Sequence, residues 1–189
     1  MEAFFLSLAT VSLAELGDRT QLLALLLAVK FRKPWPILAG LTIAAVGIHA
    51  ISAGVGMGLG QLIDDRILNW VVGLLFVGMG VWVLIPEGTH TGDRPRETGH
   101  GAFWTALVTF FLMEVGDKTQ LASMALAARF DTIIPVVLGA TGAMILVNLP
   151  VIWLGHKFAD RVPIRLVRVL AAVVFVAIGG WLIGEAFWG

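Results

Sequence analysis

Long apolar segments alternate with short polar ones along the whole chain. Six apolar segments of about 20 residues or more occupy positions 4–29, 36–60, 67–85, 102–128, 133–156 and 166–187. An α-helix needs about 20 apolar residues to cross the ~30 Å hydrocarbon core of a bilayer. The polar breaks contain residues that end helices, such as Pro34 and Pro36 in "KFRKPWP". The pattern therefore predicts an all-α polytopic membrane protein with six transmembrane helices.

The composition agrees with this class and excludes several functions. Hydrophobic residues make up 58% of the chain and charged residues 14%, with a mean hydropathy of +0.91, whereas soluble domains are about 25% charged. Thirteen basic residues balance thirteen acidic ones, so the charge indicates no nucleic-acid partner. The absence of cysteine excludes disulfides, thiolate metal sites and cysteine nucleophiles. The opening "MEAFFLSLAT" lacks a basic leader region, so the first segment is expected to be retained.

Basic residues are unevenly distributed between the two sides of the predicted membrane. The segments after the first, third and fifth helices carry nine of them: Lys30, Arg32, Lys33, Arg94, Arg96, Lys157, Arg161, Arg165 and Arg168. The opposite side carries only Arg66 and Arg129. Because cytoplasmic loops are enriched in Lys and Arg, we expect these three segments in the cytoplasm and both termini outside.

Two matching motifs, "ELGDRT" from Glu15 and "EVGDKT" from Glu114, lie near the middle of the first and fourth segments. The offset of 99 residues that aligns them also aligns other identical pairs, among them Thr10/Thr109, Pro36/Pro135, Gly40/Gly139 and Trp82/Trp181. The chain is therefore interpreted as a duplication. Residues 1–85 form the first three-helix repeat, 86–101 a central polar cytoplasmic loop, and 102–189 the second three-helix repeat.

An odd number of helices in each half makes the second copy enter the membrane from the other side. The result is a pair of inverted repeats, which in many secondary transporters meet at a substrate site near the bilayer midplane. We therefore expect the two motifs to converge there.

The converged motifs predict a site built from oxygen atoms. On a continuous helix Glu15 and Asp18 share one face, and Gly17 between them weakens the helix locally. Glu114 and Asp117 repeat this spacing. The four carboxylates would be joined by the side-chain amides of Gln21 and Gln120 and by the hydroxyls of Thr20 and Thr119.

Oxygen ligands without nitrogen or sulfur suit Ca²⁺, Mn²⁺ or Mg²⁺ better than Zn²⁺ or Cu⁺. One carboxylate in hydrocarbon costs at least ~2.5 kcal/mol, and four together repel one another until protons or a cation neutralise them. The site is therefore interpreted as that of a cation/proton exchanger. The metal is expected as transported substrate, with no resident cofactor and no enzyme activity.

Two basic residues accompany the acids. Arg19 follows Glu15 by four residues and is placed to form an intrahelical ion pair, and Lys118 stands at the same place in the second motif. Four acids and two bases leave two negative charges, which one divalent cation or two protons would balance. Exchange of two protons for one metal ion is the resulting hypothesis.

Outside the motifs, His49 aligns with Asn148 and is interpreted as one of a polar pair that packs between helices. The glycines at 54, 56, 58 and 60 are interpreted as sites of close helix packing.

The doubled Glu-x-Gly-Asp-[Lys/Arg]-[Thr/Ser] motif resembles that of the Gdt1-like family of cation/proton exchangers, and the resemblance covers the whole chain. That family includes Golgi manganese and calcium transporters of eukaryotes and manganese exporters of bacteria. The resemblance implies transport of Mn²⁺ or Ca²⁺ with protons as counter-ions, through Glu15/Asp18 and Glu114/Asp117. The short chain and compact central loop suggest a prokaryotic plasma-membrane protein that exports the metal.

Three other functions fit the sequence less well. An intramembrane aspartyl protease is disfavoured because position 15 is Glu where that signature has Gly. An exporter of a small organic cation or amino acid is the main alternative, and it would need an apolar cavity with few polar groups. A passive channel commonly surrounds its pore with identical subunits, whereas the symmetry here is internal. The sequence leaves the preference between Mn²⁺ and Ca²⁺, the direction of flux and the oligomeric state open.

Overall fold

The structure is a computed structural model that describes residues 1–85, 101–154 and 164–188. These residues are all-helical, as predicted. The predicted central polar loop lies outside the described residues apart from Gly101, and so does most of the break between the fifth and sixth segments. The helices are α1 (Glu2–Glu15), α2 (Arg19–Phe31), α3 (Pro34–Gly60), α4 (Asp65–Leu84), α5 (Gly101–Glu114), α6 (Lys118–Phe130), α7 (Ile134–Leu154) and α9 (Ile164–Trp188).

Four helices in the described part of the chain are long and apolar enough to cross a membrane. They are α3, α4, Ile134–Trp153 of α7 and Val169–Trp188 of α9. The full helices α3, α4, α7 and α9 have bounds within two residues of the segments that the apolar pattern predicts. The chain is therefore a multi-pass membrane protein.

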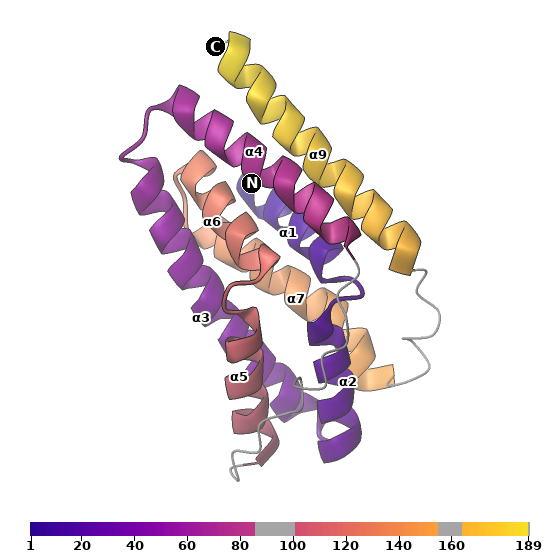
Figure 1. Cartoon of the computed structure of the whole chain (residues 1–189). Helices are drawn as coiled ribbons and strands as arrows, with labels where there is room; N and C mark the ends of the chain where they lie inside the picture. Colours follow the sequence, from indigo (N-terminus) through magenta and orange to yellow (C-terminus); the bar gives the residue numbers. More distant parts are fainter. Residues whose placement is uncertain (86–100, 155–163, 189) are drawn as a thin grey trace.

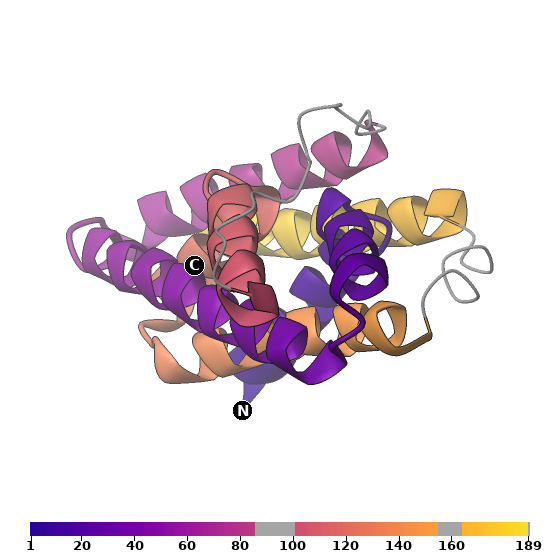
Figure 2. The ribbon, with the colours of Figure 1, turned by 90° about the horizontal axis from the view of Figure 1, so that it is seen from below.

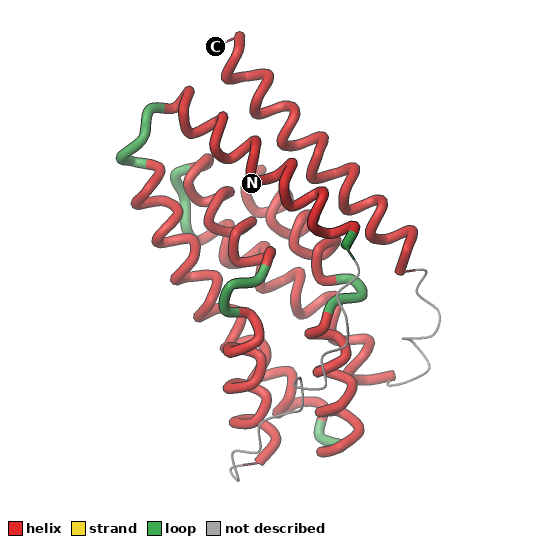
Figure 3. Tube along the Cα trace, in the orientation of Figure 1, coloured by secondary structure: helices red, strands yellow, loops and turns green. Residues whose placement is uncertain are grey.

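The first and fourth predicted segments are each broken in two, and here the prediction of continuous helices was wrong. The interruptions lie at residues 16–18 and 115–117, between α1 and α2 and between α5 and α6, and Figure 3 shows them as short loops. Each half-helix has 13 or 14 residues. At 1.5 Å per residue such a helix is about 20 Å long, which is shorter than the hydrocarbon core.

Each broken pair packs against a long helix of the other half of the chain. The half-helices α5 and α6 lie along α3, while α1 and α2 lie along α7, and α3 contacts α7. The helices α4 and α9 lie side by side along one flank, as Figures 1 and 2 show from two directions. This exchange of partners brings the two interruptions to the middle of the molecule.

Glycines allow the closest of these approaches. A Cβ at Gly40 of α3 would overlap the backbone of α5 at Phe103, and one at Gly139 of α7 would overlap α1 at Phe4. Among the four glycines near the end of α3, Gly56 and Gly60 press on α6 in the same way, which confirms the packing interpretation for them. Gly54 and Gly58 have open space beside them, so for these two the interpretation was wrong.

Two clusters of buried apolar side chains lie on either side of the interruptions. One is built mainly from α4, α6 and α9, with residues of α1, α3 and α7. The other is built from α2, α3, α5 and α7, with Val11 of α1. The helix ends that meet between the clusters carry the two acidic motifs.

Candidate cation-binding site

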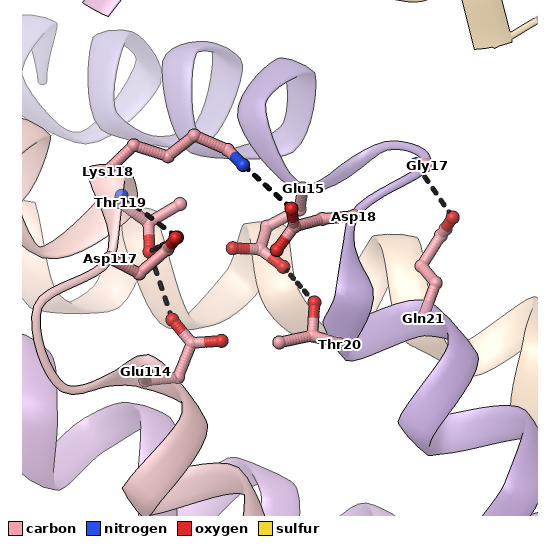
Figure 4. Close-up of polar contacts among 9 residues, drawn as sticks. All are labelled: Glu15, Gly17, Asp18, Thr20, Gln21, Glu114, Asp117, Lys118 and Thr119. Carbon is pink, nitrogen blue, oxygen red and sulfur yellow. Dashed lines mark hydrogen bonds and ion pairs between the residues drawn. The ribbon is translucent and has the colours of Figure 1, made fainter. Parts of the chain in front are cut away.

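The two motifs meet where the half-helices end, as Figure 4 shows. Glu15 is the last residue of α1 and Glu114 the last of α5. Asp18 and Asp117 are the residues that immediately precede α2 and α6. The expectation that Glu15 and Asp18 share one face of a continuous helix was therefore wrong. The convergence of the motifs comes from two helix ends facing one another.

A glycine creates each interruption. Gly17 and Gly116 have φ angles of +78° and +83°, a left-handed conformation that side chains other than glycine adopt only at a cost. The N–H of Gly17 donates to Oε1 of Gln21 at 2.8 Å, and that of Gly116 to Oε1 of Gln120 at 2.7 Å. The glutamine of each motif thus stabilises the loop of that same motif.

The two glutamines therefore have a different role from the expected one. Gln21 also donates from Nε2 to the carbonyl oxygen of Val147 at 3.2 Å, which anchors the first loop to α7. In Figure 4 its side chain lies on the far side of Gly17 from the carboxylates. Both amides stabilise the loops, and that of Gln21 does not face the acidic cluster (Figure 4).

Three of the four acids form a compact cluster. Glu15, Glu114 and Asp117 each place one carboxylate oxygen within 4.8 Å of the others. Their exposed fractions are 0%, 1% and 5%. Three carboxylates that are buried this close together repel one another, so they must be neutralised by a cation or by protons. The cluster offers the hard oxygen ligands that Ca²⁺, Mn²⁺ and Mg²⁺ accept.

Threonine hydroxyls orient the two glutamates in the same way. Thr20 Oγ1 donates to Glu15 Oε2 at 2.6 Å, and Thr119 Oγ1 donates to Glu114 Oε2 at 3.0 Å. The other oxygen, Oε1, is buried without a hydrogen-bond partner in both glutamates. A buried carboxylate oxygen left without a partner is costly. These two atoms are therefore the best-placed ligands for a cation or proton.

The fourth acid lies beside the cluster, in an ion pair (Figure 4). Asp18 Oδ1 lies 2.7 Å from Nζ of Lys118, and both side chains are buried. The expectation of four converging carboxylates is therefore met by three, with Asp18 in an ion pair beside them. Asp117, its counterpart, instead accepts from the backbone N–H of Thr119 at 3.4 Å, and its Oδ2, at 3.2 Å, shares the Thr119 hydroxyl with Glu114.

The helix break also changes the position of Arg19. The residue begins α2, whereas Glu15 ends α1, so the two do not lie on one continuous helix as expected.

The expected pairing of His49 with Asn148 was wrong. His49 Nδ1 lies 2.9 Å from the hydroxyl of Ser123, which links α3 to α6. Asn148 donates to the carbonyl oxygen of Met144 on its own helix. Ser123 could not be predicted from the sequence, because its partner His49 lies 74 residues away along the chain.

Comparisons with known proteins point in one direction. The profile of a family described as "Divalent cation/proton antiporter GDT1" matches residues 3–91 and 102–189. A Vibrio cholerae protein named "Putative manganese exporter" is 40% identical over 177 residues, which cover 93% of this chain and 88% of the relative. The Arabidopsis thaliana "GDT1-like protein 5" is 27% identical over 216 residues, covering 95% and 94%. No solved structure matches the chain.

Proposed function

The chain belongs to the divalent cation/proton antiporter GDT1 family, and we propose that it exchanges a divalent cation for protons through the site where its two motifs meet. Membership makes it a transporter and not an enzyme, with a divalent metal ion and protons as the substrates of its family. The observation that carries the proposed site is the pair of buried, partnerless Oε1 atoms of Glu15 and Glu114 within the three-carboxylate cluster.

The proposed topology has six spans. Each pair of half-helices, α1 with α2 and α5 with α6, crosses the membrane once, and each of the four long helices crosses once. Residues 1–85 and 102–189 are then two three-helix repeats of opposite orientation, joined by a central polar loop. Half-helices that end at a cation site near the midplane support this arrangement, because secondary transporters with inverted repeats use them in the same way.

The proposed orientation has both termini outside a prokaryotic plasma membrane, so that the basic loops face the cytoplasm. Since the chain has no cysteine, single cysteines test this directly. Leu62→Cys should react with an impermeant maleimide in intact cells, and Lys33→Cys only after permeabilisation. The reverse labelling would invert the topology.

Mn²⁺ is the proposed substrate, with Ca²⁺ as the other metal that such ligands accept. The name of the Vibrio cholerae relative supports Mn²⁺ and export. When the metal leaves, protons take its place on Glu15, Glu114 and Asp117, because three bare carboxylates within 4.8 Å of one another repel strongly. This alternation couples metal movement to proton movement in the opposite direction.

The chemistry of the cluster argues against the alternative, an exporter of a small organic cation or amino acid. Such a carrier would need an apolar cavity with few polar groups. The three carboxylates that meet here instead lie within 4.8 Å of one another and are buried. That arrangement suits a metal ion, which carboxylate oxygens bind directly.

Flux in proteoliposomes with an internal pH dye tests the proposal. We expect Mn²⁺ uptake to drive opposite proton movement, with about two protons per metal, and we expect Glu15→Gln and Glu114→Gln each to abolish it. Glu2→Gln, an exposed acid at the start of α1, is the matched control and should transport normally. Metal flux that survives both substitutions would refute the site, and a different proton ratio would refute two-for-one exchange.

A further inference from the structure

The ion pair between Lys118 and Asp18 joins the two motifs directly. Lys118 is the first residue of α6 and Asp18 the residue before α2, a separation of 100 residues in sequence. The Nζ–Oδ1 distance is 2.7 Å, and the exposed fractions of the two residues are 5% and 6%. In Figure 4 the lysine side chain reaches across from the second motif to the first, beside Glu15.

Structural cohesion is a weak explanation for this pair. Removing two charges from water costs about as much as their attraction returns, so a buried ion pair adds little stability over apolar packing. The pair also places a positive charge next to a site built to bind a positive ion. In electrostatic terms the lysine competes with the cation.

The aspartates of the two motifs have different partners, and the difference indicates a role for Lys118. Asp117 is one of the three acids that lie within 4.8 Å of one another, whereas its counterpart Asp18, at their edge, is paired with Lys118 (Figure 4). One ligand of an otherwise doubled set is thus occupied by an internal cation.

We propose that the Lys118 ammonium is a tethered counter-cation that holds Asp18 while the metal is absent and yields it when the metal binds. Metal arrival gives Asp18 a stronger partner, so the carboxylate turns to the ion and the lysine withdraws. On the return step the lysine recaptures Asp18 and helps to expel the metal. The lysine therefore lowers the affinity for the metal and speeds its release. This inference rests on the proposed function.

Binding and transport of Lys118→Met test the inference, with Mn²⁺ alone as the probe. In detergent-solubilised protein, titration calorimetry should show Mn²⁺ binding at least about tenfold tighter than wild type, because a unit charge several ångströms from a divalent ion costs more than that in affinity. In proteoliposomes the same variant should turn over at least about tenfold more slowly. Lys118→Arg keeps the charge and should stay within a few-fold of wild type in both measurements. Unchanged or weaker Mn²⁺ binding in Lys118→Met would overturn the inference, since a structural role predicts one of those results.

A second comparison works even if Lys118→Met folds poorly. Asp18→Asn should weaken Mn²⁺ binding, because the ligand is lost while the lysine charge stays. Adding Lys118→Met to that variant replaces the ion pair by a neutral pair and should restore part of the affinity. If the Mn²⁺ affinity of the double variant is equal to or lower than that of Asp18→Asn, the lysine does not compete with the metal.

The two levels of the proposal fail in different ways. If wild-type protein binds neither Mn²⁺ nor Ca²⁺, the proposed function fails and the inference with it. If wild type binds and Glu15→Gln does not, while Lys118→Met shows no tightening, the function stands and only the tethered counter-cation is wrong.

Discussion

The threonines of the two motifs fix which glutamate oxygen is left for the ion. Each hydroxyl occupies Oε2, and each Oε1 is left buried without a hydrogen-bond partner. The same arrangement in both copies indicates that the hydroxyls serve the site and not just local packing. Their side chains are as buried as the acids that they orient.

Replacing both hydroxyls should weaken metal binding without removing the carboxylates. We expect Thr20→Val and Thr119→Val each to lower the Mn²⁺ affinity by about tenfold, since a buried hydrogen bond to a charged group is worth about 1.5–3 kcal/mol. Calorimetric titration measures this directly. Thr42→Val is the control, because Thr42 donates only to Leu38 of its own helix. An equal effect in the control would assign the change to general stability.

At the scale of the helix, the interruption is the feature that makes the site. A continuous helix would carry Glu15 and Asp18 on one surface and leave its backbone bonds satisfied. The break instead exposes a helix C-terminus, which attracts cations, next to the glutamate that ends it. The left-handed glycine and the glutamine that binds its N–H are the two devices that hold this shape.

Substitution at the glycine should therefore damage function through the backbone alone. A Cβ at Gly116 meets nothing within 4 Å, yet its φ of +83° disfavours any side chain. We expect Gly116→Ala to cost about 1–2 kcal/mol of unfolding free energy in detergent and to reduce Mn²⁺ transport strongly. Gly58→Ala, in open space inside α3, should cost nothing and gain up to about 1 kcal/mol. Normal transport by Gly116→Ala would show that the break tolerates another conformation.

The convergence of the acids could be predicted from the sequence, and the helix break could not. The motif and the duplication predicted that Glu15, Asp18, Glu114 and Asp117 would meet, and the structure brings three of them within 4.8 Å of one another. Their role as metal ligands stays a prediction.

Apolar residues lie on both sides of residues 16–18 and 115–117, so the pattern predicts one continuous helix in each case. A single glycine in such a segment is common in membrane helices and does not by itself predict a break. Contacts such as Lys118 with Asp18 depend on how two distant helix ends meet, which local patterns do not encode.

For the whole molecule, the main feature is that α4 and α9 are placed asymmetrically. α4 packs against α6 and α9 against α1, but the pair makes no comparable contact with α2 or α5 in the described part of the chain. Figure 1 shows α2 and α5 extending beyond the pair at the opposite end. If the halves are copies, an equivalent state exists in which the α4–α9 pair lies against α2 and α5. Transport is then expected to interchange the two arrangements.

A cross-link that fixes the observed arrangement should stop the cycle. Arg129 of α6 and Glu185 of α9 form an ion pair at 2.7 Å, so cysteines at these two positions can be joined by a short bis-methanethiosulfonate, which links them through reducible disulfides. We expect the link to block Mn²⁺ flux and its reduction to restore it. The control joins α4 to α9 through cysteines at Arg66 and Ala186, which are hydrogen-bonded and move together, and it should transport. Undiminished flux through the α6–α9 link would mean that these helices do not separate.

The shared site also sets an order for biosynthesis. The first motif leaves the ribosome and enters the bilayer about 100 residues before the lysine that neutralises Asp18 is made. Until then the nascent first half carries acids that lack their final partners. Completion of the second half supplies those partners. A chain truncated before Lys118 is therefore left with an unfinished charge cluster that membrane quality control can recognise and degrade.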